Sequence, residues 1–587
     1  MHEAPGGPPG GRRLAALRLA AAVATGALLA AAFPGPDIGP LALIALVPLL
    51  LAVETARPRQ AGAFGYLAGL TFFGLHLLWI AEFLSWTGAV AWLAWGALSA
   101  FEALFVAAFF ALVPATRRLG GWRLLVLPAC WAAIELLRAH QPLGGFPWGL
   151  LALSQHGGGP LLPLARVLGG YGLAAVLVAV NLVVACWLRA LPAAAARRPW
   201  RWRRLAAVAG WPALAAGLVA AGLLAPAAPP AAGPTLDLVV VQAGLRGGHG
   251  IDLGQSTEAV FANHVRLTEE LGEGAGGPRP DLVVWGEGAA DADPLRNPDR
   301  LARVARAAET IQAPILLGAT TLVDPTHRAT EALLFTPGGQ LADRYRKRRL
   351  VPFGEFVPWG GLLGRLVPAT RQGVPYDKAP GRTLEPLLVD GVRVGTVICW
   401  ESAYQEDARQ LTRDGAGLLL VMTNNASFGD GPGSRQHLAT SQLRAVEEGR
   451  TVVHAAVTGI SAVVGVDGVA RQQTGLYQQT TVPVSVGVRS GLTFYARFGR
   501  GVEAGLVGVA VGGVVAVVLL ALWRRGLLGG VGRPEAPPSL REVQSVGRGP
   551  RPASGGQPPL SGDATEASGG EPQPGAGFQA PSGRGSL

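Results

Sequence analysis

A chain of 587 residues is longer than one ordinary domain. Hydrophobic residues make up 49% of it and charged residues 15%, and its mean hydropathy is +0.32, which excludes both an ordinary soluble enzyme and a protein made of membrane spans alone. The formal net charge of +11 does not indicate a nucleic-acid partner, because the arginines are not gathered in one patch.

Long apolar runs predict about eight helices that cross a membrane. A bilayer core needs about 20 predominantly apolar residues for each helix. The first run is not expected to be a cleaved signal peptide, since further runs follow it closely and no small-residue cleavage site stands out. The expected spans are 14–33, 38–54, 61–80, 88–113, 122–138, 161–188, 204–225 and 502–523.

The arginines between these runs predict the orientation of the protein. They gather before the first span and after the second, fourth, sixth and eighth, whereas the alternate loops carry almost none. Because basic residues favour the cytoplasmic side, both termini are expected in the cytoplasm and residues 226–501 on the outer side. The arginines concerned are Arg12, Arg13, Arg18, Arg57, Arg59, Arg117, Arg118, Arg123, Arg197, Arg198, Arg201, Arg203, Arg204, Arg524 and Arg525.

The sequence pattern of the outer segment is typical of a globular α/β domain. Short β-branched runs such as LDLVVVQAG, DLVVWGEG and GLLLVMTNNA alternate with helical patterns, which favours an α/β or layered αββα sandwich. The Pro-, Gly- and Ser-rich tail is expected to be disordered. The predicted parts are a membrane domain of seven helices (1–225), a linker (226–234), a catalytic domain (235–501), a last membrane helix (502–525) and a cytoplasmic tail (526–587).

Cys399 is the only one of three cysteines in the outer segment. A lone thiol there is either buried and inert or a nucleophile. Cys399 ends the strand VRVGTVIC where a helix is expected to begin, and two other chemically active groups, Glu287 and Lys347, also stand at strand ends. A thiol with a carboxylate base and a cation makes a plausible catalytic set.

One basic residue is a lysine where the basic residues around it are arginines. Lys347 lies among Arg344, Arg346, Arg348 and Arg349, in a chain that has only one other lysine, Lys378. A compact ammonium can point at one oxyanion, whereas the planar fork of arginine would not fit the same small site.

Three motifs resemble the catalytic motifs of the nitrilase, or carbon–nitrogen hydrolase, superfamily: WGEGAA, YRKRRLVPFGEFVP and GTVICWES. The runs FPGPDIGPLALIALVPLL, GFPWGLLALSQ and NNASFGD resemble the apolipoprotein N-acyltransferase family. Together the resemblance covers about residues 14–524 and leaves out the tail.

The resemblance implies a role for each matching residue. Glu287 would be the general base, Lys347 the oxyanion stabiliser and Cys399 the nucleophile. Supporting roles in orienting Lys347 and shaping the pocket would fall to Glu355 and Glu401. Candidates for substrate binding are Trp148, Phe356, Trp359, Trp400, Asn424 and Asn425.

The implied reaction is a ping-pong acyl transfer. The thiol would take an acyl chain from a phospholipid as a thioester, and the N-terminal amine of a diacylglyceryl-modified apolipoprotein would then accept it. No metal or other cofactor is expected, and the protein would work as a monomer in the bacterial inner membrane, with its catalytic domain on the periplasmic side.

Three questions stay open at this level. The apolar stretch that follows Glu355, within the loop 353–368, is either a lid that contacts lipid or an interior loop. A membrane-tethered amidase of the nitrilase type would use water instead of an amine as acceptor. A non-catalytic protein that binds lipoproteins would not need Cys399 at all.

Overall fold

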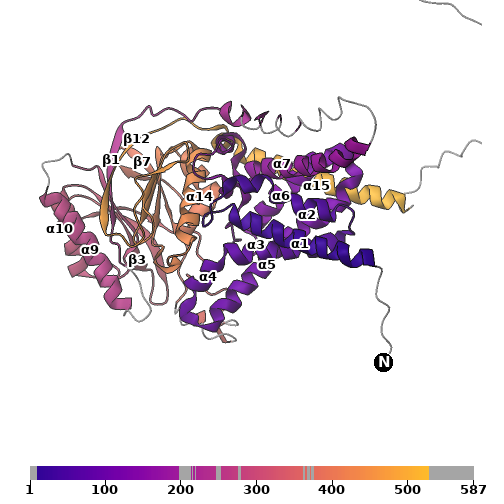
Figure 1. Cartoon of the computed structure of the whole chain (residues 1–587). Coiled ribbons are helices and arrows are strands. Elements are labelled where there is room, and N and C mark those ends of the chain that lie inside the picture. The colour runs from indigo at the N-terminus through magenta and orange to yellow at the C-terminus, as the bar shows by residue number, and fades with distance from the viewer. Residues whose placement is uncertain are drawn as a thin grey trace, which may run out of the picture. The chain divides into compact units, whose positions relative to one another are not determined.

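Figure 1 shows the computed structural model of the chain, which describes residues 9–196, 220–245, 253–274, 279–360 and 376–525 together with a few isolated positions. Three expected features lie largely outside these residues. They are the seventh span (204–225), the tail (526–587), and the part of the loop 353–368 that contains Leu362, Leu363 and Leu366.

Apolar helices form a bundle in which α1 packs against α3, α3 against α5, α6 against α7, and α15 against both α6 and α7. The bundle buries a large apolar core that includes Phe33, Phe73, Phe109 and Phe110. The helices are α1 (Pro9–Ala31), α2 (Val47–Val53), α3 (Pro58–His76), α4 (Leu78–Phe83), α5 (Ala89–Ala115), α6 (Arg123–His140), α7 (Ala165–Ala196) and α15 (Phe494–Arg524).

Helices therefore occupy the positions of seven of the eight expected spans. Within the described residues, four helical stretches are long and apolar enough to cross a membrane: 11–31, 89–140, 162–191 and 494–524. The second of these joins α5 and α6 across η3 (Thr116–Trp122), where Gly120 leaves the helical conformation with φ +56°. The number of spans and their orientation remain predictions.

The strand-rich region contains two six-stranded sheets. The first has the order β12-β1-β2-β3-β4-β5, in which β1, β2 and β3 run parallel and the other pairs antiparallel. Its strands are β1 (Thr235–Gln242), β2 (Leu282–Ala290), β3 (Ile315–Leu322), β4 (Arg328–Phe335), β5 (Leu341–Arg346) and β12 (Thr480–Gly487).

The second sheet has the order β11-β10-β9-β8-β7-β6, with β7, β8 and β9 parallel. Its strands are β6 (Leu387–Val389), β7 (Val392–Ile398), β8 (Leu418–Thr423), β9 (Val452–Ala456), β10 (Ala462–Val464) and β11 (Ala470–Arg471). Because most residues of β8 and β9 are buried on both faces, these strands read as continuous apolar runs in the sequence.

The two sheets stack face to face over a shared apolar core that takes Leu238 and Val284 from one sheet and Leu420 and Val453 from the other. Helices α9 (Leu253–Glu273) and α10 (Pro298–Ile311) cover the first sheet, and α13 (Gln405–Arg413) and α14 (Gly433–Glu448) pack on the second. This confirms the sandwich of two sheets between helices that the strand pattern predicted.

Helix α14 joins this sandwich to the helical bundle. It packs against β9 on one side and against α7 on the other, so most of its side chains, including polar ones such as His437 and Glu447, are buried. The sandwich and the bundle therefore belong to one compact unit, residues 1–525.

Candidate active site

Glu287 lies in a bulge of β2. The pairing of β2 with β3 shifts between Trp285 and Ala290, which turns the Glu287 side chain out of the regular alternation. The neighbouring strand carries Gly318 at this point, and a Cβ atom added there would lie 2.6 Å from the Cα of Glu287. A larger residue at position 318 would therefore push the bulge out of place.

Lys347 follows β5 and is buried, with 1% of its side chain exposed. Its Nζ donates a hydrogen bond of 2.9 Å to Glu287 Oε1 and lies 3.1 Å from Glu355 Oε2. Burial alone would lower the pKa of Lys347, but Glu287 and Glu355 outweigh it and raise the pKa well above its usual value. Lys347 is therefore a fixed cation between two carboxylates.

Glu355 is the carboxylate that holds Lys347 from the other side. Its Oε2 also accepts a hydrogen bond of 3.0 Å from the backbone N–H of Val351, and its Oε1 lies 3.0 Å from Nζ of Lys378. Burial would raise the pKa of Glu355, but the two ammonium groups lower it to about 2. Glu355 thus stays ionised at neutral pH and is unsuited to accept a proton.

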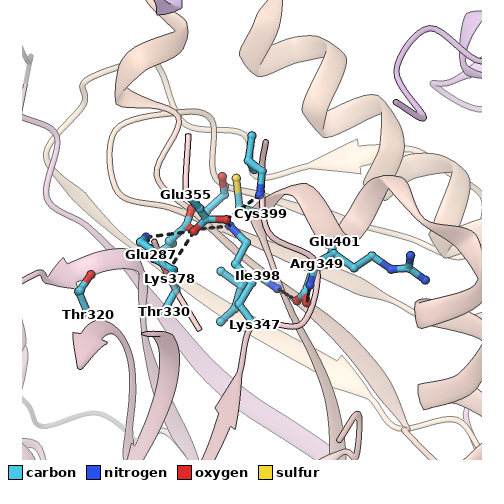
Figure 2. Close-up of polar contacts among 12 residues, drawn as sticks. Glu287, Thr320, Thr330, Lys347, Arg349, Glu355, Lys378, Ile398, Cys399 and Glu401 are labelled. Atoms are coloured by element: carbon cyan, nitrogen blue, oxygen red, sulfur yellow. Dashed lines mark hydrogen bonds and ion pairs between the residues drawn. The ribbon is translucent and has the colours of Figure 1, made fainter. Parts of the chain in front are cut away.

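Cys399 stands at the turn between β7 and the short 3-10 helix η6 (Cys399–Ala403). Its backbone has φ +52°, a left-handed conformation that is uncommon for a non-glycine residue and is often found at functional turns. Its side chain is half-buried beside the cluster of Glu287, Lys347 and Glu355 (Figure 2).

The thiol of Cys399 is protonated in the resting site. Burial and the charge of Glu287 raise its pKa to about 12, although Lys347 and the Thr423 hydroxyl oppose this shift. A thiol in this state needs a base before it can attack. Glu287, a carboxylate of the same cluster, is the candidate for that base.

Glu401 links the segment that follows Lys347 to the end of β7, just before Cys399. One of its oxygens accepts hydrogen bonds from the backbone N–H groups of Arg348 (2.7 Å) and Arg349 (3.1 Å), and the other accepts from the N–H of Ile398 (2.8 Å). The Tyr345 hydroxyl donates to the same carboxylate at 2.8 Å. Glu401 is fully buried, and both of its oxygens accept hydrogen bonds from these donors. It therefore positions the segments that carry Lys347 and Cys399.

Two of the substrate-binding candidates, Trp148 and Trp400, are buried and in contact with each other. Trp148, from the loop after α6, is 2% exposed, and its ring stacks on that of Trp400 with centroids 5.5 Å apart. Its Nε1 donates a hydrogen bond of 2.7 Å to Gln436 Oε1 of α14. The structure therefore places Trp148 against Trp400, the residue that follows Cys399 in sequence.

The other candidates lie at the ends of loops. Asn424 and Asn425 follow β8; Asn424 is partly exposed, whereas Asn425 is buried and has φ +61°. Phe356 is half-buried, and Trp359 is 67% exposed with φ +49°.

Sequence reasoning missed two residues of the site. Lys378 contacts Glu355, and His437 of α14 places its Nε2 3.1 Å from the carbonyl oxygen of Cys399 and its Nδ1 3.0 Å from Asn425 Oδ1. The rarity of lysine in this chain was a signal for Lys378, whereas nothing in the helical pattern around His437 singled it out. Within the described ranges, no group of three or more His, Cys, Asp or Glu side chains could hold a metal ion.

Comparisons with known proteins match two parts of the chain to known families. A family model for the apolipoprotein N-acyltransferase N-terminal domain matches residues 25–183, and one for carbon-nitrogen hydrolase matches residues 256–486. A carbon-nitrogen hydrolase from Helicobacter pylori of known crystal structure aligns with 46% of this chain and 92% of its own, at 15% identity and a TM-score of 0.33.

Two relatives match along most of their length. The apolipoprotein N-acyltransferase of Geobacter metallireducens is 31% identical over 522 residues, which are 86% of this chain and 95% of that protein. The apolipoprotein N-acyltransferase of Mycolicibacterium smegmatis is 34% identical over 538 residues, 86% of each chain. The chain therefore belongs to the apolipoprotein N-acyltransferase family, as an integral membrane enzyme with a carbon–nitrogen hydrolase domain.

Proposed function

We propose that this protein transfers an acyl chain from a membrane phospholipid to the N-terminal amine of the diacylglyceryl-cysteine of apolipoproteins, through a thioester on Cys399. The observation that carries the site assignment is the position of Lys347, a buried cation between Glu287 and Glu355, beside the half-buried thiol at its left-handed turn.

In the first half of the reaction, Glu287 takes the thiol proton and the Cys399 sulfur attacks the sn-1 ester carbonyl of the phospholipid. Protonation of Glu287 weakens its hold on Lys347, so the ammonium can turn its charge to the developing oxyanion. The tetrahedral intermediate collapses as the ester C–O bond breaks. Glu287 then returns its proton to the leaving oxygen, which gives a lysophospholipid and a thioester.

In the second half, the amine of the apolipoprotein attacks the thioester. Glu287 accepts a proton from the attacking nitrogen and returns it to the sulfur as the C–S bond breaks. Lys347 faces the oxyanion again, and Glu355, which stays ionised, keeps the ammonium in place between the two halves. The products are the amide and the free thiol.

The membrane part fits lipid substrates. We propose eight spans, both termini in the cytoplasm and the catalytic domain (235–501) on the periplasmic side of the inner membrane, with the protein acting as a monomer. The arginine pattern and the helices at seven of the expected positions support this arrangement. Because each CH₂ exposed to water costs about 0.8 kcal/mol, the site must meet its lipids at the membrane surface.

The loop after Glu355 is proposed as the lipid-facing edge of the site. In its described part Trp359 is 67% exposed, and Phe353, two residues before Glu355, is 43% exposed. Such residues next to an active site suit contact with acyl chains. Together with Trp148, Phe356, Trp400, Asn424 and Asn425, Trp359 completes the proposed set of substrate contacts.

The test is a transfer assay with the full chain in phospholipid vesicles, using a phospholipid labelled in its sn-1 chain and a synthetic diacylglyceryl lipopeptide as acceptor. The expected product is the labelled amide. Cys399→Ser and Glu287→Gln should abolish it, while the matched controls Cys186→Ser and Glu385→Gln, both at exposed positions, should not.

The same assay separates the alternatives. Labelled free fatty acid at the expense of the amide would favour a hydrolytic amidase-type enzyme. Full transfer activity in Cys399→Ser would contradict the proposal.

A further inference from the structure

The two lysines of this chain meet on a single carboxylate. Of 50 Lys and Arg residues only Lys347 and Lys378 are lysines, and they lie on opposite oxygens of Glu355: Lys347 Nζ is 3.1 Å from Oε2 and Lys378 Nζ is 3.0 Å from Oε1. A chain that otherwise uses arginine thus places both of its ammonium groups in one site. This makes Lys378 a candidate part of the catalytic machinery.

Lys378 is held in place by its backbone as well as by its side chain. Its N–H donates to the carbonyl of Glu355 at 2.8 Å, and the next residue, Ala379, donates to the carbonyl of Arg328 at 2.7 Å. Its Nζ also donates to Thr330 Oγ1 at 2.7 Å (Figure 2). Of the Lys378 side chain, 21% is exposed. Lys378 is thus held by its backbone N–H, by its contact with Thr330 and by its contact with Glu355, unlike a solvated surface lysine.

Among the four groups Glu287, Glu355, Lys347 and Lys378, the charges balance only when Lys378 is included. Glu287 and Glu355 carry two negative charges, and Lys347 and Lys378 carry two positive ones. Without Lys378 the cluster would hold one excess negative charge beside the Cys399 thiol. Ionising that thiol would then be harder, and Lys347 would be bound more tightly by Glu355.

We propose that Lys378 is a positioning residue for acylation, which holds the Glu355 carboxylate ionised and in place so that Lys347 stays available to the oxyanion. This inference rests on the proposed role of Lys347 and Cys399 and deepens it. Lys378 itself touches no reacting atom in this mechanism and acts through Glu355.

A pH profile separates this role from a merely structural one. Besides Glu355, the charged groups among the described residues that interact most with Lys378 include Lys347, Glu287 and Asp291. Removing the Lys378 ammonium raises the pKa of Glu355, because one of the two cations that lower it is lost. The acid limb of the acylation rate should then move to higher pH.

The experiment compares Lys378→Met, Lys378→Arg and the unmodified protein, each as the full chain in vesicles of labelled phospholipid without acceptor. The single-turnover rate of thioester formation is followed from about pH 3 to about pH 8, because the pKa of Glu355 is lowered to about 2 and its protonation falls at the acid end. Lys378→Met should slow it about tenfold and move the acid limb up by about one pH unit. Lys378→Arg keeps the charge and should leave the limb where it is.

The control is Arg344→Met, which removes one positive charge from an exposed position of β5. It should change neither the rate of thioester formation nor the position of the acid limb. An unshifted limb in Lys378→Met, at a normal or a reduced rate, would overturn the inference and leave the proposed function standing. Absence of any thioester in the unmodified protein would instead contradict the proposed function. The thermal midpoint of each variant, measured in parallel, identifies a variant that fails to fold, and Lys378→Gln then replaces Lys378→Met under the same criteria.

Discussion

The rings of Trp148 and Trp400 stack 5.5 Å apart with their planes at 5°, which joins a loop of the helical bundle to the residue that follows Cys399. The Trp148 Nε1 hydrogen bond to Gln436 extends this link into α14, and Gln436 Nε2 donates in turn to the carbonyl of His76 in α3. These contacts link the turn at Cys399 to the packing of the bundle.

Trp148→Ala should destabilise the protein by about 3–5 kcal/mol, because it removes a large buried side chain and leaves Gln436 without its donor. The measurement is the thermal midpoint in detergent together with the rate of thioester formation, and both should fall. Trp122→Ala, at a position 71% exposed, is the control and should change neither. Equal midpoints for the two variants would show that the stack carries no stability.

Lys347→Arg should lower thioester formation about a hundredfold to a thousandfold, the usual effect of losing an oxyanion donor. The position is 1% exposed and closed by two carboxylates, so the larger guanidinium cannot take the place of the ammonium. Arg346→Lys is the matched control: Arg346 pairs with Glu331 at 2.9 Å and is one-third exposed, so activity should be kept. An active Lys347→Arg enzyme would refute the role of Lys347.

Trp359→Ser should impair the use of phospholipid more than the use of a short soluble ester. The indole is 67% exposed and is proposed to meet acyl chains, which a soluble ester lacks. The measurement is the ratio of thioester formation rates with the two donors. Leu341→Ser, which removes an exposed apolar residue from β5, is the control. Equal losses with both donors would count against a lipid-facing loop.

The thiol of Cys399 should react slowly at neutral pH and faster at every higher pH. Its pKa is raised to about 12, so the thiolate fraction grows about tenfold with each pH unit between about pH 7 and about pH 9. The rate of alkylation by iodoacetamide measures this, in a Cys130→Ala, Cys186→Ala background that leaves Cys399 alone. A plateau in this range would mean that the resting site already holds a thiolate.

The strand-end pattern was enough to single out Glu287, Lys347 and Cys399 as candidates. The structure brings Glu287 and Lys347 within 2.9 Å, although their strands, β2 and β5, are not neighbours and have β3 and β4 between them in the sheet. The bulge that turns Glu287 toward Lys347 and the left-handed turn at Cys399 could not be predicted, because both depend on the packing of adjacent segments.

Contacts between distant segments account for the rest. Lys378 reaches Glu355 only because its backbone pairs with Arg328 at the start of β4. Trp148 meets Trp400 only because the helical bundle packs on the sandwich. Neither contact leaves a periodic signal in the sequence. The membrane helices were predicted from their apolar runs, since the length of such a run is a local property.

The most direct test of the central claim is to locate the acyl group on the enzyme. Incubated with labelled phospholipid and no acceptor, the protein should carry one hydroxylamine-sensitive acyl group, and mass spectrometry of its peptides should place it on Cys399. Addition of a diacylglyceryl lipopeptide should discharge it as an amide. An acyl group that persists in Cys399→Ser, or an active protein that never carries one, would contradict the account.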